Sequence, residues 1–430
     1  MVELKEFLDD NKKPVVIVGL GYVGLPLAVE FSKIRSVIGY DIQLERILDL
    51  QRGVDKTLEV SAKNLSNNNL KFTNNIDDLH QSKIYVVTVP TPIDSNNQPD
   101  LQPIISATHE LGKILKKEDL VIYESTVFPG TTEEVCVPIL EANSGLTYNK
   151  DFYLGYSPER VNPGDKVHTI PNIVKVVSGS NEDAALILER LYSSIISAGI
   201  FIASSIKVAE AAKVIENTQR DLNIALMNEL SLIFDLMNID TKAVLDAANT
   251  KWNFLNFQPG LVGGHCIGVD PYYLTYKAQS LGYDPKIILA GRTLNDQMSK
   301  HIVDKLLASM TKKDIDVKDS KILVMGLTFK ENCPDIRNSK VFDVVSSLKE
   351  KCLAVDVFDP WVDSNDESIV GIMNIINQPQ FNSYDGIIVA VGHSVFVDLG
   401  IEKIKRFAKK QSVLFDVKSI FPIDSSDVRL

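Results

Sequence analysis

The sequence predicts an α/β fold in which two parallel-sheet domains are joined by a central helical domain with one long helix. Up to about residue 202, short apolar runs alternate with amphipathic stretches; a long helical run follows, and strand-like runs return in the last third of the chain. Apolar strands that alternate with helices are typical of a parallel sheet covered on both faces. We therefore expect an α/β domain on each side of the helical domain.

Each element follows from a local pattern. The first region carries five apolar runs that predict buried strands, at residues 15–18, 37–40, 84–89, 120–123 and 152–156. A helical run without Gly or Pro then extends from Ser205, placed as its N-cap, to about Met237. After a polar stretch, strand-like runs return at residues 322–325, 355–358, 387–391 and 413–415. The predicted domains are residues 1–202, 203–312 and 313–430.

The composition excludes several classes of protein. At roughly 100 to 200 residues per domain, a chain of 430 residues holds several domains, each with its own core. Hydrophobic residues make up 45% and charged residues 23%, as in ordinary globular chains, which argues against long disordered regions. The net charge of -11 argues against a broad nucleic-acid surface, because phosphate binding needs clustered Lys and Arg. A small anionic ligand remains compatible with an acidic chain.

Targeting and cysteine patterns are also informative. Residues 1–10 lack a basic region followed by an apolar stretch, so we expect no secretory signal and a cytoplasmic protein. The longest uncharged apolar stretch, residues 14–29, is shorter than the roughly 20 residues of a membrane span. The four cysteines show no CxxC pairing, which indicates neither a disulfide frame nor a metal site and leaves one of them as a candidate reactive thiol.

A G-x-G-x-x-G motif, with Gly19, Gly21 and Gly24, follows the first predicted strand and opens a helix, and Asp41 follows the second strand. This is the dinucleotide fingerprint in its required context. The glycines let backbone N–H groups approach a pyrophosphate at the helix N-terminus, and Asp41 can accept hydrogen bonds from a ribose hydroxyl. A carboxylate there repels a 2′-phosphate, which favours NAD over NADP. The alternative is a tight structural turn.

Two further strand ends suit the same ligand. Thr91 follows the third predicted strand and Thr126 the fourth. Ligands of open α/β sheets bind outside the carboxyl ends of the strands. For Thr91 and Thr126 we therefore give equal weight to two interpretations, a contact with cofactor or water and a place in an ordinary loop. For Thr131 we favour a T-x-x-E capping box with Glu134.

On the long helix, Lys213, Asn217 and Arg220 fall on one stripe at about 100° per residue. The apolar residues roughly opposite are Ile215, Leu222 and Ile233. The pattern alone favours a solvated polar face. A Lys/Asn pair is also able to stabilise an oxyanion during hydride transfer, and that alternative stays open.

The segment Gly263-Gly264-His265-Cys266-Ile267-Gly268-Val269-Asp270-Pro271 is the most informative. Asp270 is expected to cap a helix that begins at Pro271, so Cys266 would lie in a glycine-rich loop before a helix N-terminus, a setting that suits a thiolate nucleophile. The alternatives are a small buried cysteine, a cap role only for Asp270, and glycines that form turns. His265 has no second metal ligand at a credible spacing and is treated as structural.

Residues 326–330 follow a strand but lack the further glycines of a second dinucleotide site. Lys330 and Arg337 would either meet phosphates across a domain cleft or form a surface pair.

Together these motifs resemble the UDP-glucose/GDP-mannose dehydrogenase family, in order from about Val15 to Lys418. The matching segments are the fingerprint at Gly19, Ser125-Thr126, Ser157-Pro158-Glu159-Arg160, the helix with Lys213 and Asn217, the Cys266 loop and Phe329-Lys330. The resemblance implies an N-terminal Rossmann-like NAD domain, a central dimerisation domain, and a C-terminal Rossmann-like domain that completes the nucleotide-sugar site.

The family's chemistry is two successive NAD-dependent oxidations of a sugar C6 alcohol to an acid through an enzyme thioester. By resemblance, the catalytic residues are Cys266 as nucleophile, Lys213 and Asn217 at the oxyanion, Asp270 and Thr126 at water, and Glu159 as base. The implied cofactor contacts are Gly19, Gly21, Tyr22, Val23, Gly24, Asp41, Arg46, Thr91, Thr126 and Arg337. The implied substrate contacts are Glu159, Arg160, Val161, Lys213, Asn217, Arg220, Phe254, Leu255, Gly263, Phe329 and Lys330.

The sequence differs from that of the UDP-glucose enzymes at positions that indicate another branch of the family. Arg160 stands where those enzymes typically place an aromatic residue, and Lys418 stands near where they use an arginine. Residues 156–164 and 252–255 resemble the branch that acts on UDP-N-acetylhexosamines. Within it the resemblance is closest to enzymes that make UDP-N-acetylglucosaminuronate or its galacto isomer for surface polysaccharide such as capsule. We expect a homodimer that uses two NAD per substrate.

Other substrates and classes remain. UDP-N-acetylmannosamine and UDP-glucose are alternative substrates. A two-electron β-hydroxyacid dehydrogenase also combines a dinucleotide fold with a Lys-x-x-x-Asn helix, but needs neither the thiol of Cys266 nor a third domain. A nucleotide-sugar sensor would keep the fold without turnover.

Overall fold

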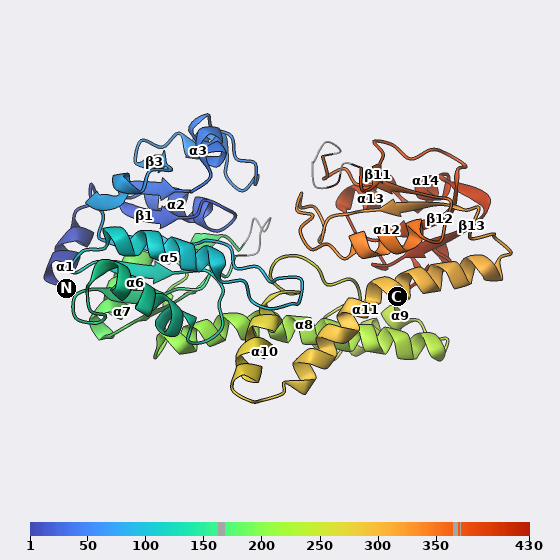
Figure 1. The fold of residues 1–430 in the computed structure, drawn as a ribbon. Helices are drawn as coiled ribbons and strands as arrows, with labels where there is room; N and C mark the ends of the chain where they lie inside the picture. The colour runs from blue at the N-terminus through green and yellow to red at the C-terminus, as the bar shows by residue number, and fades with distance from the viewer. Residues whose placement is uncertain (162–167, 364–368, 370) are drawn as a thin grey trace. The chain divides into compact units, whose positions relative to one another are not determined.

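The computed structural model describes residues 1–161, 168–363, 369 and 371–430 (Figure 1). The chain divides into two compact units. Unit 1 consists of Met1–Glu216 with Tyr272–Tyr283, and unit 2 of Asn217–Pro271 with Asp284–Leu430. The division into three domains at residues 202 and 312 stays a prediction.

Unit 1 is built on an eight-stranded sheet with the order β3-β2-β1-β4-β5-β6-β7-β8. The strands are β1 (Val15–Val18), β2 (Val37–Tyr40), β3 (Leu70–Thr73), β4 (Ile84–Val87), β5 (Leu120–Tyr123), β6 (Tyr153–Tyr156), β7 (Lys175–Gly179) and β8 (Ile200–Ile202). The order of the first six strands is that of a dinucleotide-binding Rossmann sheet, in which the strand order reverses beside β1. The carboxyl ends of β1, β2, β4 and β5 therefore open at one edge.

All five predicted strands of this region are present, although β4 ends at Val87. The five predicted strands all pair in parallel, as expected, and the one antiparallel pairing joins β6 to the unpredicted strand β7. Strands β3, β7 and β8 were not predicted. Strand β7 begins with Lys175, and a lysine in a five-residue run hides the apolar pattern of a buried strand.

Helices cover both faces of this sheet, as expected for a doubly wound fold. On one face, α1 (Val2–Asp9), α2 (Gly24–Ser32), α3 (Leu44–Gln51) and α7 (Glu182–Ser193) contribute to one core. On the other, α5 (Gln102–Ile114), α6 (Val137–Ser144) and the first turn of α8 form a second core. A short helix, α4 (Ala62–Leu65), precedes β3.

Unit 2 contains a six-stranded sheet in the order β11-β10-β9-β12-β13-β14, with every pair parallel. The strands are β9 (Lys321–Met325), β10 (Ala354–Phe358), β11 (Asn374–Ile375), β12 (Tyr384–Val389), β13 (Ala408–Asp416) and β14 (Val428–Arg429). Helices α11 (Lys286–Lys312) and α12 (Val341–Lys349) pack on one face, and α13 (Ser394–Leu399) and α14 (Ile401–Lys405) on the other. The predicted second α/β domain is confirmed.

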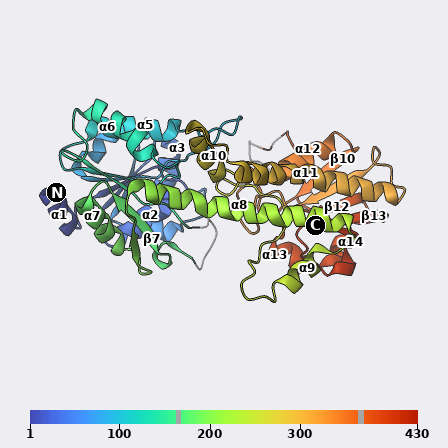
Figure 2. The same cartoon turned by 90° about the horizontal axis from the view of Figure 1, so that it is seen from below.

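The long helical run is α8 (Ile206–Leu236), seen as one continuous helix in Figure 2. Ser205 caps it as predicted, since its Oγ accepts a hydrogen bond from the N–H of Val208. Within unit 2, α8 from Asn217 onward lies beside α11, and α9 (Thr241–Ala248) follows α8 in the chain. Helix α10 (Asp270–Ser280) belongs to unit 1 from Tyr272 onward. Among the helices of the described residues, none is long and apolar enough to cross a membrane.

Candidate active site

The glycine motif forms a tight loop between β1 and α2. Gly19 has a positive φ of 95°, which favours glycine, and α2 begins at Gly24. A Cβ on Gly24 would lie 1.9 Å from the carbonyl oxygen of Gly19 and 2.3 Å from Oγ1 of Thr88, so no side chain fits there. A Cβ on Gly21 would meet nothing within 4 Å. The loop is thus closely packed at its third glycine and open at its second, which fits a backbone approach to a dinucleotide pyrophosphate.

Asp41 lies against this loop at the end of β2. Its Oδ2 accepts a hydrogen bond from the N–H of Leu20 at 2.9 Å, and its Oδ1 one from Gln43. Arg46, a predicted cofactor contact, donates from Nε to the carbonyl of Leu20 and pairs with Asp55 at 2.9 Å. Both side chains therefore hold the glycine loop in shape, and their contact with the cofactor stays a prediction.

The loops after β4 and β5 are joined by side chains. Ser125 Oγ donates to the carbonyl of Val89 at 2.6 Å, and Tyr273 of α10 donates to the carbonyl of Pro92. Thr91 and Thr126 lie half-buried on these adjacent loops, at the same sheet edge as the glycine motif. This is the location in which open α/β sheets bind ligands.

The predicted capping box at Thr131 is wrong. Thr131 Oγ1 donates to the carbonyl of Phe128, and Glu134 forms ion pairs with Lys207 and Lys277. The acceptor for this segment is Glu210 of α8, whose carboxylate receives the N–H groups of Gly130 and Thr132.

Glu210 was missed because a single Glu among alanines on a long helix gives no sign that it is buried. Burial raises the pKa of Glu210 to about 7. Its two acceptor bonds join α8 to the loop that follows Thr126, so protonation of one carboxyl acts directly on that loop.

Glu159 lies three residues after the end of β6, and backbone N–H groups fix its carboxylate. Its Oε1 accepts hydrogen bonds from the N–H groups of Arg160 and Val161, at 2.7 and 2.5 Å. Arg160 itself pairs with Glu216 at 2.8 Å and donates to the carbonyl of Val174. Asn162, Pro163 and Gly164, which belong to the same sequence run, lie outside the described residues.

The polar stripe on α8 is buried. Lys213 and Asn217 are both buried, whereas Ile215 and Ile233 on the opposite side are exposed. The interpretation as a solvated face is therefore wrong for Lys213 and Asn217 and holds for the exposed Arg220. Lysine is rarely buried in proteins and isoleucine usually is, so this helix reverses the ordinary pattern. The reversal supports a functional role for the stripe that contains Lys213 and Asn217.

The Cys266 loop of unit 2 depends on two glycines. A Cβ on Gly263 would lie 2.6 Å from the carbonyl oxygen of Asn338, and Gly264 has a φ of 83° with the Phe329 ring 2.7 Å from its Cβ position. The carbonyl of Cys266 accepts the N–H of Asp270 at 2.8 Å. Helix α10 begins at Asp270 itself, one residue earlier than predicted, so Asp270 is its first residue rather than its cap.

The structure brings Asn217 and Asp270 together. Asn217 Nδ2 donates to Asp270 Oδ2 at 2.5 Å, and both side chains are buried. Cys266 is partly exposed, whereas Cys136, Cys333 and Cys352 are buried, and burial raises the pKa of Cys136 to about 12. Of the four cysteines, all of them in described parts of the chain, Cys266 is the one that is not buried.

The segment after β9 packs on the same loop. The His265 ring lies edge-on to Phe329 at 5.9 Å, and Lys330 Nζ is 5.6 Å from the centre of the Phe329 ring. Arg337 pairs with Asp335 at 2.6 Å and contacts Nδ1 of His265 at 3.2 Å. Although burial opposes it, the Arg337 guanidinium lowers the pKa of Asp335. The structure thus shows Arg337 in a pair, and a phosphate contact stays a prediction.

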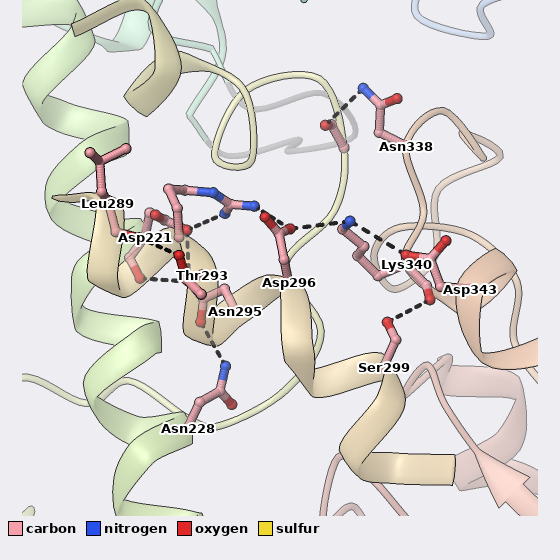
Figure 3. A network of polar contacts seen from close by, with 12 residues as sticks. Asp221, Asn228, Leu289, Thr293, Asn295, Asp296, Ser299, Asn338, Lys340 and Asp343 are labelled. Atoms are coloured by element: carbon pink, nitrogen blue, oxygen red, sulfur yellow. Dashed lines mark hydrogen bonds and ion pairs between the residues drawn. The ribbon is translucent and has the colours of Figure 1, made fainter. Parts of the chain in front are cut away.

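A polar network with a buried ion pair at its centre joins α8, α11 and Lys340, which directly precedes α12 (Figure 3). Arg292 pairs with Asp221 at 2.6 Å and with Asp296 at 2.7 Å, and Lys340 joins Asp296 at 3.1 Å. Asn338 Nδ2 donates to the carbonyl of Gly264 at 3.4 Å. Asn338 thus ties the Cys266 loop to the segment that carries Lys340, a link that the sequence does not reveal.

Other predicted contacts are less constrained. Phe254 is half-buried and Leu255 exposed in the segment between α9 and α10, and their substrate contact stays a prediction. In the described parts of the chain, no group of three or more His, Cys, Asp or Glu residues is arranged to hold a metal ion.

A glycine loop and an acidic residue at the β1 and β2 ends, together with a cysteine beside an Asn–Asp pair, define a dehydrogenase with a dinucleotide-binding Rossmann unit. Residues 13–196, 207–297 and 323–423 match the NAD binding domain, the central domain and the UDP binding domain of the UDP-glucose/GDP-mannose dehydrogenase family. The chain belongs to this family, and its cofactor is NAD.

The chain is similar over nearly its whole length to named relatives. It is 58% identical to UDP-N-acetyl-D-glucosamine 6-dehydrogenase of Pseudomonas aeruginosa, with 97% of this chain and 99% of the relative covered. It is 56% identical to the enzyme of the same name from Salmonella typhi, with 97% and 98% covered. The solved structure of a UDP-D-ManNAc dehydrogenase from Pyrococcus horikoshii superposes with a TM-score of 0.87 at 31% identity, over 97% of this chain and 98% of that one.

Proposed function

We propose that the chain oxidises the C6 hydroxyl of UDP-N-acetylglucosamine to the carboxylate, using two NAD per substrate. The observation that carries the proposal is the partly exposed Cys266, in a glycine loop directly before α10 and four residues from the Asn217–Asp270 pair. The identities of 58% and 56% to two UDP-N-acetyl-D-glucosamine 6-dehydrogenases support the choice of substrate.

The proposed reaction has three chemical stages. NAD accepts the hydride in each of the two oxidations. Between them Cys266 attacks the aldehyde carbon, and the second oxidation turns the resulting thiohemiacetal into a thioester. Lys213 and Asn217 stabilise the oxygen that carries negative charge, because an ammonium and an amide N–H aimed at a developing oxyanion lower the barrier. Glu159 takes a proton from the water that hydrolyses the thioester, while Asp270 and Thr126 hold water.

Binding follows the same division of residues. The proposed NAD contacts are Gly19, Gly21, Tyr22, Val23, Gly24, Asp41, Arg46, Thr91, Thr126 and Arg337. The proposed UDP-sugar contacts are Glu159, Arg160, Val161, Lys213, Asn217, Arg220, Phe254, Leu255, Gly263, Phe329 and Lys330. We assign the product to surface polysaccharide such as capsule, and the reaction to the cytoplasm.

A panel of UDP-sugars tests the substrate. Incubation with NAD and the UDP forms of N-acetylglucosamine, N-acetylgalactosamine, N-acetylmannosamine and glucose should give the highest kcat/KM with the first. A higher kcat/KM with a different sugar would overturn that choice, and binding without NADH from any sugar would indicate a sensor.

The number of NADH molecules per sugar tests the mechanism. Two NADH per substrate are expected, and a Cys266→Ala variant should lose the uronic acid product. A yield of one, or full activity in that variant, would identify a two-electron dehydrogenase. In Cys266→Ser an ester should form and hydrolyse slowly, so intact-mass analysis should find an adduct of the mass of the substrate's acyl group.

We further propose that the chain is a homodimer through α8. Four exposed apolar residues line one side of this helix at spacings of 7 and 11 residues: Val208, Ile215, Leu226 and Ile233. These spacings return to the same helix face within about 20°. An exposed apolar stripe of this length is typical of a protein interface. Light scattering should give twice the chain mass of 47.7 kDa, and Ile215→Glu with Ile233→Glu should give monomers.

A further inference from the structure

A lysine is buried at the start of β7 in unit 1, between two glutamates. The side chain of Lys175 is only 6% exposed. Its Nζ lies 2.8 Å from Oε2 of Glu124, 3.2 Å from the carbonyl oxygen of Pro158 and 3.6 Å from Oε2 of Glu159. The first two oxygens accept hydrogen bonds from the ammonium, and Glu159 forms an ion pair with it at the longer distance.

Lys175, Glu124 and Glu159 form a cluster, and its Glu124 side is shut off from solvent. The Glu124 side chain is fully buried, and its second oxygen accepts a hydrogen bond from the hydroxyl of Tyr192 on α7. The Lys175 Nζ also lies 5.3 Å from the centre of the Tyr192 ring. Burial opposes the charged form of Lys175, but the two carboxylates raise its pKa above the ordinary value. Lys175 is therefore a protonated cation with fixed surroundings.

The contact with Glu159 is not needed to neutralise the lysine. One buried carboxylate, Glu124, already compensates one buried ammonium, and it does so at the shorter distance. A second carboxylate beside the pair adds a negative charge to a buried place, which costs free energy unless the arrangement serves something else. Glu159 is the outer member of the cluster, with a side chain 13% exposed.

Glu159 is held at both of its oxygens. Two backbone N–H groups bind Oε1, and Lys175 faces Oε2. A carboxylate held in this way keeps one orientation, which a general base needs in order to meet a water molecule.

We propose that Lys175 is a positioning residue for thioester hydrolysis, which it serves by orienting Glu159, while Glu124 and Tyr192 hold Lys175 in place. This role rests on the function proposed for Glu159. In the step concerned, a water proton passes to Glu159 as the water oxygen bonds to the thioester carbon. The C–S bond then breaks with its electron pair on Sγ of Cys266, and the carboxylic acid product releases its proton to solvent.

A purely structural role makes a different prediction. If Lys175 serves only to neutralise Glu124, removal of both charges should restore the enzyme, because no unpaired buried charge is left. If Lys175 serves Glu159, the double variant Glu124→Gln with Lys175→Met should fold like the wild type and still hydrolyse the thioester slowly. The double variant therefore separates the two roles even where Lys175→Met alone folds poorly.

The test is rapid mixing of enzyme, NAD and UDP-N-acetylglucosamine, with NADH absorbance and intact mass as readouts. In Lys175→Met and in the double variant we expect a burst of two NADH per site. Steady-state turnover should then be about 10- to 100-fold slower than in the wild type, and an acyl adduct should accumulate on the protein. Lys175→Arg, which keeps the cation, should retain most of the hydrolysis rate. Lys83→Met, which removes a partly buried lysine of the same unit that pairs with Glu3, is the matched control and should show no burst.

The possible outcomes separate the role of Lys175 from the proposed function of the chain. A wild-type yield of two NADH with unchanged hydrolysis in the double variant, and no adduct, would overturn the role of Lys175 alone. A wild-type yield of one NADH would overturn the proposed function and this role with it. An adduct that accumulates equally in Lys83→Met would show that general destabilisation causes the effect and would also overturn the proposal.

Discussion

The buried ion pair between Asp221 and Arg292 offers a quantitative test of how α8 and α11 are held together in unit 2 (Figure 3). The two side chains are 0% and 3% exposed and 2.6 Å apart. Removal of one partner from such a pair costs about 3 to 5 kcal/mol, because the other charge stays buried without compensation. Asp296 still pairs with Arg292 at 2.7 Å, so we expect the lower limit, about 3 kcal/mol, for Asp221→Asn.

Removal of both charges should change the free energy of unfolding very little. Burial raises the pKa of Asp221 even though Arg292 lies beside it, which means that the pair does not offset the cost of burying the carboxylate. The double variant Asp221→Asn with Arg292→Met should therefore be within about 1 kcal/mol of the wild type. Asp304→Asn breaks the exposed pair with Lys300 on α11 and should change the stability by less than about 0.5 kcal/mol.

The assay is urea unfolding followed by tryptophan fluorescence. Both tryptophans, Trp252 and Trp361, belong to unit 2, so the signal reports the unit that contains the pair. With a slope of about 3 kcal/mol per M, a loss of 3 kcal/mol lowers the midpoint by about 1 M. A midpoint for Asp221→Asn within about 0.2 M of the wild type, or a double variant as unstable as the single one, would refute the reasoning.

Three further outcomes follow from the structure. Because the pKa of Glu210 is raised from 4.5 to about 7, the folded state binds its proton more tightly, and stability should fall by about 2 kcal/mol between pH 5.5 and 8. Glu210→Gln should remove this part of the pH dependence in urea unfolding followed by circular dichroism, and an unchanged profile would contradict it. Gly264→Ala, at a φ of 83° and against an aromatic ring, should cost about 1 to 2 kcal/mol in thermal unfolding and change the rate at which iodoacetamide labels Cys266; an unaltered labelling rate would argue against a rigid loop. Gly24→Ala should weaken NADH binding at least about tenfold in a fluorescence titration, because the new Cβ would overlap the carbonyl oxygen of Gly19, and an unchanged Kd would show that α2 can shift without cost.

The success of the sequence-based predictions depended on how local the pattern was. The strand, glycine turn and acidic residue of the fingerprint lie within 27 residues, from Val15 to Asp41, and the structure has them as predicted. Strand β7 was missed because Lys175 looks like a surface residue until its partners Glu124 and Glu159 are known. These partners lie 51 and 16 residues away in the chain and meet Lys175 only when the sheet forms.

Helix α8 also shows that a local pattern does not predict which polar side chains are buried. The helical period correctly placed Lys213 and Asn217 on one stripe, opposite Ile215. Which stripe faces solvent does not follow from the period, because polarity predicts burial only where nothing polar pairs with the buried side chain. Asn217 is buried with the carboxylate of Asp270, 53 residues further along the chain.

The sequence by itself determined the class of fold, the glycine loop after β1, the cap of α8 at Ser205 and the place of Cys266 in a loop before a helix. All of these depend on hydrophobic period, backbone freedom or capping, which act over a few neighbouring residues. The tertiary structure decided which charges are buried together: Glu124 with Lys175 and Glu159, Asp221 with Arg292, and Glu210 with the loop after β5. Burial of a charge depends on partners brought from distant parts of the chain, and no local pattern contains that information.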